Sequence, residues 1–98
     1  MKVYYNNGIL AEERNVHNGQ LSGAFKRYMP NGKPIYEMNY KDNEENGTEK
    51  TYDKDGVLLI SKDFYMGIPH GLTIVTDPAT HKTTRYTYHY GDLINVAE

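Results

Sequence analysis

Cysteine is absent from this sequence, and it has neither a long hydrophobic run nor a large excess of one charge. The lack of cysteine excludes disulfides and thiolate metal sites and leads us to expect a cytoplasmic protein. Residues 1–20 contain no continuous apolar segment of the secretory type, and no run approaches the roughly 18 apolar residues of a transmembrane helix. A formal net charge of −2 does not attract phosphates or anionic lipids. We therefore expect no nucleic-acid partner and disfavour a membrane partner.

Aliphatic side chains are also scarce, and tyrosine takes their place. The hydrophobic share is 38%, below the roughly 45–50% of ordinary globular chains, so a thick buried core is not expected. The sequence has ten tyrosines, which combine a large apolar ring with a polar hydroxyl that can stay in water. Because tyrosine also favours strands, the composition indicates one folded, β-rich domain over residues 1–98.

Glycines recur at intervals of 24 residues and form three columns that hold all nine of them. The columns are Gly8, Gly32 and Gly56; Gly23, Gly47 and Gly71; and Gly19, Gly67 and Gly91. Asn43 fills the vacancy in the last column and Asn95 extends the second, and asparagine tolerates positive φ next best after glycine. The columns therefore predict turns that return twice in every repeat.

Two turns in each repeat imply two strands in each repeat. Asn31 and Asp55 directly precede Gly32 and Gly56, and such steps are strong hairpin signals. We predict hairpin tips there and at Gly8, with looser loops near 18–23, 42–47 and 66–71. The expected strands are 2–5, 9–17, 24–29, 34–41, 48–53, 57–65, 72–76 and 82–90.

These elements predict an all-β fold, an antiparallel meander of about four tandem 24-residue β-hairpin repeats in one elongated, twisted sheet. The repeats are 4–27, 28–51, 52–75 and a degenerate capping unit, 76–98, in which an Asp-Pro bend replaces the tight turn. The charged, threonine-rich stretch Lys82–Arg85 suits the last edge of the sheet. Tyr36 and Met38 are expected on one face of their strand, together with Tyr40. Repeat columns further predict a structural ladder of aromatic side chains from Tyr4, Tyr28, Tyr52, Tyr40, Phe64 and Tyr88.

The segments "YYNNGIL", "GAFKRYMPNGKPIYEMNY" and "GTEKTYDKDGVLLISKDF" resemble the MORN-type repeat, in the bacterial variant often labelled a putative antitoxin component (the YwqK-like group). The resemblance covers residues 4–75 clearly and fades after them. It implies hairpin arrays that act as scaffolds or binding surfaces, and its bacterial members are associated with toxin–antitoxin pairing. Eukaryotic relatives are associated with membranes and phosphoinositides, but this chain lacks the basic cluster that such contact requires.

No constellation of side chains predicts catalysis, a metal or a cofactor. His17 and His89 occupy one column three repeats apart, and His70 and His81 have no partner at ligand spacing. The acidic pairs stand on adjacent positions, and no nucleophile has a partner at motif spacing. We therefore predict a protein that is not an enzyme.

One predicted loop differs from its counterparts because it is apolar, reading "MGIPHG". Either it folds back to cap the sheet, or it contacts a partner. The possible partner contacts are Tyr65, Met66, Ile68, Pro69, Leu93 and Ile94. We predict a non-enzymatic protein-interaction module, an antitoxin-like protein that binds another protein, such as a cognate toxin. The alternatives are a phospholipid-associated scaffold and a fragment of a longer structural array, and homodimerisation is left open.

Overall fold

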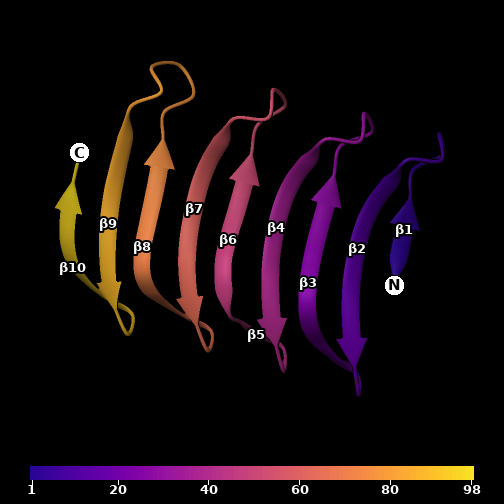
Figure 1. Cartoon of the computed structure of the whole chain (residues 1–98), viewed down its shortest axis with the longest axis horizontal. Helices are drawn as coiled ribbons and strands as arrows, with labels where there is room; N and C mark the ends of the chain where they lie inside the picture. Colours follow the sequence, from indigo (N-terminus) through magenta and orange to yellow (C-terminus); the bar gives the residue numbers. More distant parts are fainter.

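The computed structural model describes residues 1–98 as one open antiparallel sheet without helices (Figure 1). The strands are β1 (Lys2–Tyr4), β2 (Leu10–His17), β3 (Gln20–Tyr28), β4 (Pro34–Lys41), β5 (Glu44–Glu45), β6 (Gly47–Tyr52), β7 (Leu58–Tyr65), β8 (Ile68–Thr76), β9 (Thr83–His89) and β10 (Asp92–Ala97). The sheet follows chain order, with β5 pairing beside β6 on β4. The predicted all-β meander of hairpins is confirmed, and no helix capable of spanning a membrane is present.

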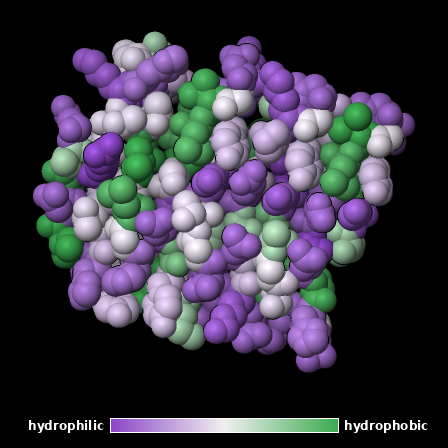
Figure 2. Space-filling model, in the orientation of Figure 1, coloured by the Kyte–Doolittle hydropathy of each residue, from purple (hydrophilic) through white to green (hydrophobic).

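The molecule is a single layer with very little interior. It measures 43 × 37 × 10 Å, and only three of its 98 residues are buried. Hydrophilic residues cross the middle of the face seen in Figure 2, and hydrophobic residues form separate patches around them. A layer this thin leaves most side chains at least partly exposed, so stability depends on cross-strand contacts within one sheet.

The predicted looser loops near 18–23, 42–47 and 66–71 are instead two-residue turns. In the first, Asn18 and Gly19 have φ angles of 51° and 77°, and His17 pairs directly with Gln20. Two successive positive φ angles are characteristic of a type I′ turn, whose twist matches that of the flanking strands. The prediction was wrong about these loops because the strands continue up to the turn on both sides.

At each predicted hairpin tip, a hydrogen bond just beyond the paired strands closes a loop of three residues; at the first tip, Tyr5 N donates to Ile9 O over 2.8 Å and encloses residues 6–8. In the first, Gly8 N donates to Tyr5 O over 3.0 Å, and the glycine alone has positive φ. Asn31 and Asp55 therefore directly precede Gly32 and Gly56 but do not share their positive φ. Asn31 acts as a hydrogen-bond acceptor instead, since its Oδ1 accepts from Lys33 N at 2.9 Å, as in an Asx turn. Positive φ is confirmed at all three tips, Gly8, Gly32 and Gly56.

The second glycine column lies inside strands and not in turns. Its members have φ angles between 102° and 114° and belong to β3, β6 and β8: Gly23, Gly47 and Gly71. A Cβ added to Gly71 would lie 2.9 Å from Oδ2 of Asp63 on β7. That carboxylate accepts hydrogen bonds from Leu72 N (3.0 Å) and Thr48 Oγ1 (2.8 Å). At Gly71 a polar side chain of the neighbouring strand occupies the place of a Cβ. At Gly23 and Gly47 an added Cβ would make only ordinary contacts of 3.5 Å and 3.6 Å, so positive φ alone favours glycine there.

Strand β10 was not predicted, and it changes the edge of the sheet. It pairs with the outer side of β9, so the stretch Lys82–Arg85, most of which belongs to β9, does not form the edge of the sheet. Asn95 does not have the positive φ expected from its column. The pairing of β10 with β9 instead shifts by one residue between Leu93 and Asn95. Asparagine tolerates φ near 50–70° but not the values above 100° that the glycines of this column adopt.

Two of the three buried side chains lie on the adjacent strands β3 and β4, and the third lies on β8. Phe25 on β3 faces Met38 on β4, and their exposed fractions are 6% and 1%. The Phe25 ring centroid lies 6.0 Å from that of Tyr36 and 5.9 Å from that of Tyr40, in edge-to-face contacts. The third buried residue, Thr73, has a hydroxyl without a hydrogen-bond partner. The small core is therefore aromatic and centred on β3 and β4.

The predicted aromatic ladder is interrupted. Each repeat contributes two strands, so one column returns on every second strand, about 9.6 Å away at the usual strand spacing. The ring contacts of the molecule join residues from different columns, as Phe25 and Tyr40 show, and none joins members of one column. The residues that lack same-column contacts are Tyr4, Tyr28, Tyr52, Tyr40, Phe64 and Tyr88.

The hydroxyl of Tyr36 makes the core sensitive to alkali. Burial and, second, its hydrogen bond to Glu49 (2.9 Å) raise the pKa of Tyr36 above its ordinary value of 10.0. Since the folded-state pKa exceeds the unfolded one, this contribution to stability is complete below about pH 10 and is lost as pH rises toward the folded pKa. We expect urea denaturation to show a steeper loss of stability above pH 10 in the wild type than in Tyr36→Phe. Equal slopes would contradict the expectation.

Candidate functional site

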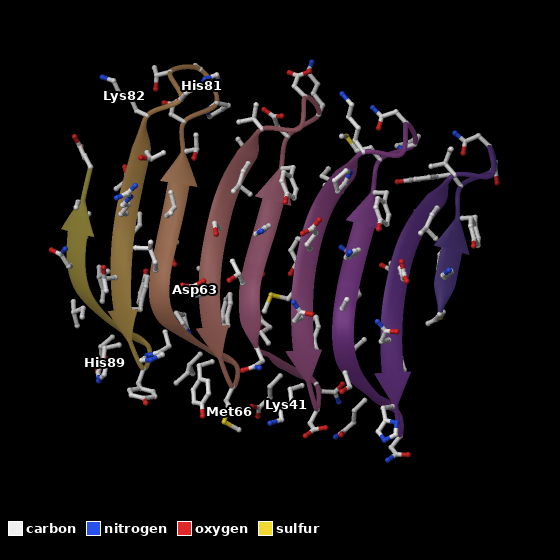
Figure 3. The ribbon with its side chains drawn as sticks, viewed as in Figure 1. Lys41, Asp63, Met66, His81, Lys82 and His89 are labelled. Carbon is white, nitrogen blue, oxygen red and sulfur yellow. The ribbon has the colours of Figure 1, made fainter.

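The candidate site lies at the end of the sheet that carries the type I′ turns. The four turns are Asn18–Gly19, Asp42–Asn43, Met66–Gly67 and Tyr90–Gly91. Asparagine and aspartate are common at positive φ, and Asn43 at 68° confirms the expectation for its column. Met66 and Tyr90 have φ angles of 48° and 45°, in a region that bulky side chains rarely adopt. Figure 3 shows Met66 and His89 at this end and His81 at the opposite end.

Four aromatic rings meet around the last two turns. The His70 ring stacks on Tyr90 with centroids 4.3 Å apart, and the Tyr65 and Tyr90 rings meet edge to face at 6.4 Å. The His89 ring lies 5.4 Å from His70 and 4.7 Å from Tyr90. We call these four residues together with Met66 the turn cluster. Its rings come from β7, β8, β9 and the final turn, so tertiary structure brings together side chains that are up to 25 residues apart.

Hydrogen bonds from the preceding hairpin fix the final turn. Gly91 N donates to Pro69 O over 2.7 Å, and Tyr90 N donates to His70 Nδ1 over 3.0 Å. The turn one repeat earlier is held in the same way, since Gly67 N donates to Glu45 O over 2.8 Å. Each turn is thus attached to its neighbour, which explains how bulky residues are kept at positive φ.

The turn cluster is largely accessible to solvent. The exposed fractions of Tyr65, Met66 and Tyr90 are 48%, 53% and 57%. Exposed aromatic and methionine side chains on a rigid support are typical of the anchoring residues of protein interfaces. The loop therefore does not fold back over the sheet.

The structure brings together four of the six predicted contact residues. Tyr65 and Ile68 face each other across the turn, with Met66 between them and Pro69 next in the strand. Leu93 and Ile94 are exposed but belong to β10, which β9 separates from β8. The residues missed by sequence reasoning are His70, His89 and Tyr90.

The proximity of His70 and His89 follows from the strand register alone. Thr76 pairs with Thr83 around the Asp-Pro bend, and counting back from that pair places His70 opposite His89. The sequence instead draws attention to His17 and His89, which share a column but lie on β2 and β9. A shared column predicts equivalent environments, whereas contact requires neighbouring strands.

The hydrogen bond to His70 opposes metal binding at this pair. Because Nδ1 of His70 accepts from Tyr90 N, the neutral ring carries its proton on Nε2. A metal-bound imidazole needs a lone pair on the ligating nitrogen and usually donates its other N–H. No group of three or more His, Asp or Glu side chains is arranged to hold a metal ion.

One charged side chain outside the turn cluster, Glu12, has two ion-pair partners. Glu12 forms ion pairs with Arg14 and Arg27, and its pKa is lowered chiefly by the hydrogen bond from Arg14. One open hollow beside Met66 is lined by Lys41, Asp42 and Glu44, side chains of a solvated edge. The arrangement supports surface binding better than chemistry on a substrate.

Comparison with known protein families gives one match. The model of the MORN repeat variant matches residues 1–18, 21–42 and 45–65, which is more than half of the chain. The matched segments stop at Tyr65, immediately before the Met66–Gly67 turn. No curated protein and no solved structure matches this sequence.

Proposed function

This chain belongs to the MORN repeat variant family, and we propose that it is a protein-interaction module that binds another protein through its turn cluster. MORN repeats in general are non-enzymatic modules of interaction or membrane association. The match is to the repeat itself and does not distinguish a YwqK-like subgroup.

Backbone strain at two bulky residues carries this proposal. Met66 and Tyr90 take positive φ at positions where the first two turns use Asn18 and Asp42. An L-residue in this region costs roughly 1–2 kcal/mol, so the fold alone favours asparagine or glycine at both positions. Strained residues that persist at an exposed site are characteristic of functional surfaces.

A protein fits the cluster better than a membrane or a nucleic acid. None of its five members is a lysine or an arginine, whereas phosphate-bearing surfaces are recognised by these side chains. Exposed Met66 and tyrosine rings can enter pockets of a partner, while the hydroxyl groups and the Nε2–H of His70 can form hydrogen bonds. The proposed complex thus combines a few aromatic anchors with directional polar contacts.

The finer proposal is an antitoxin-like role, in which the bound protein is a cognate toxin held inactive. It is supported by the family resemblance and by an exposed cluster that is suited to a partner. A pull-down from the native host, with the Met66→Asn/Tyr90→Asn double variant as matched bait, tests it. We expect the wild-type bait, but not the double variant, to retain a protein. That protein should inhibit growth when it is expressed alone, and co-expression of the present chain should relieve the inhibition. A retained protein that does not affect growth would reject the antitoxin role and keep the interaction module.

Single replacements in the cluster should separate stability from binding. We expect Met66→Asn and Tyr90→Asn each to raise the free energy of unfolding by about 1 kcal/mol, because asparagine suits the first position of a type I′ turn. The same replacements remove an anchor and should weaken partner binding about tenfold or more. Urea denaturation and titration calorimetry with the recovered partner measure the two effects.

Asp42→Asn is the matched control, since it changes the equivalent position of another turn without removing an apolar side chain. It should leave stability and binding nearly unchanged. If the two cluster variants gain stability but retain full affinity, binding uses another surface of the sheet.

A further inference from the structure

His70 couples the final turn to the state of one titratable group. Its Nδ1 accepts the hydrogen bond from Tyr90 N at 3.0 Å, and its ring stacks on Tyr90 at 4.3 Å. The acceptor exists only while Nδ1 keeps its lone pair, because both ring nitrogens are donors in the protonated form. Protonation would place an N–H of the ring against the N–H of Tyr90.

The equivalent position one repeat earlier provides an acceptor that does not titrate. Residue 46 is 24 positions before residue 70, and Oδ1 of Asn46 lies 3.5 Å from Met66 N as its acceptor. The two turns therefore share one architecture, in which the residue at this position accepts from the first residue of the following turn. Only the final turn uses histidine, so only this turn depends on pH through its acceptor.

Titratable groups approach His70 from each adjoining element. Strand β7 contributes Tyr65, with rings 6.1 Å apart, and also Asp63, which contacts the next residue of β8. Asp63 is already an acceptor for Leu72 N. Strand β9 contributes His89, whose ring lies 5.4 Å from His70, and β10 begins with Asp92, the cross-strand partner of His89.

We propose that His70 is an acid-sensitive latch, and that its protonation releases the Tyr90 turn and disperses the turn cluster. Histidine is the side chain that gains a proton between neutral and mildly acidic pH, so the latch is closed in neutral solution and opens when acid protonates Nδ1. Once both rings are protonated, repulsion between like charges whose ring centroids lie 5.4 Å apart favours separation of His70 from His89. The strained φ of Tyr90 favours release once its N–H has lost its acceptor.

The consequence for binding rests on the function proposed above, whereas the latch itself does not. If the turn cluster binds a partner, the complex should weaken as pH falls from 7.5 to 5.0. The surface would then bind at neutral pH and release its protein ligand in acid.

Amide hydrogen exchange of the free protein tests the latch directly. After correction for the intrinsic rate at each pH, we expect protection of the Tyr90 amide to fall about tenfold between pH 7.5 and 5.0, the loss corresponding to one ordinary hydrogen bond. The Met66 amide, which is bound to Asn46, is the internal control and should show no such fall. His70→Asn should keep the Tyr90 amide protected at both pH values, and His89→Asn should retain the pH dependence.

Two outcomes would overturn the latch: Tyr90 protection that is independent of pH in the wild type, or a pH dependence that persists in His70→Asn. Measurements of partner affinity at pH 7.5 and 5.0 then distinguish the latch proposal from the proposal that the turn cluster is the binding site. Acid-weakened binding in the wild type but not in His70→Asn supports both of them. A latch that opens in a protein whose cluster variants bind normally supports the latch and rejects the cluster as the binding site.

Discussion

Replacing Phe25 with alanine is expected to lower the free energy of unfolding by about 3–5 kcal/mol. The ring is the centre of the only aromatic core in the central strands, with Met38 facing it across the strand pair and 6% of its own surface exposed. Domains of this size are stable by only about 5–15 kcal/mol. The expected loss is therefore a large part of the total stability.

The ring also organises charged neighbours. The guanidinium carbons of Arg14 and Arg27 lie 5.3 Å and 5.1 Å from its centroid, and both arginines bind Glu12. Removal of the ring leaves their apolar stems without a surface to cover. Because the sheet has no second layer that could collapse into the gap, little relaxation is expected.

Urea denaturation followed by circular dichroism measures this loss. Tyr4→Ala is a suitable control, since Tyr4 is 57% exposed on the edge strand β1 and surface replacements usually change stability by less than about 0.5 kcal/mol. A loss below about 1 kcal/mol in Phe25→Ala would show that stability is spread evenly along the sheet.

Replacing Gly71 with alanine should destabilise the protein by about 2–4 kcal/mol. Its φ of 108° is unfavourable for any L side chain, and the new Cβ would lie 2.9 Å from Oδ2 and 3.1 Å from Cβ of Asp63. The carboxylate cannot retreat without losing its hydrogen bonds to Thr48 and Leu72. Backbone strain and a broken polar contact therefore add together.

Gly19→Ala separates these two contributions. Gly19 also has positive φ, at 77°, but nothing lies within 4 Å of an added Cβ. Its replacement should show the backbone effect alone, about 1–2 kcal/mol, measured by the same urea titration. Equal losses in the two variants would mean that Asp63 moves aside freely.

The spacing of the glycines predicts positive φ but not whether a glycine lies in a loop or in a strand. Positive φ follows from the spacing at Gly8 and Gly23 alike, but one lies in a loop and the other inside a strand. Gly23 belongs to β3 and pairs with Tyr40 of β4, whereas Gly8 lies between β1 and β2. Strand pairing decides this difference, and the spacing of glycines does not reveal it.

The candidate site was predictable only in its local part. The apolar composition of the 65–69 segment singles out Tyr65 and Met66 as possible partner contacts, and both side chains are exposed. It does not reveal that Tyr90 joins them, because the Tyr90 turn comes to lie beside this segment through the pairing of β8 with β9. Nor does the composition reveal that His70 accepts a hydrogen bond from Tyr90 N.

The sequence by itself determined the all-β class, the repeat of two strands and the places where the backbone needs positive φ, because each follows from local conformational preference repeated at constant spacing. Tertiary structure decided which turns are tight, which glycines face a neighbouring side chain, and which residues meet at the turn cluster. These features depend on strand register, and register is set by contacts between segments that are distant in the chain.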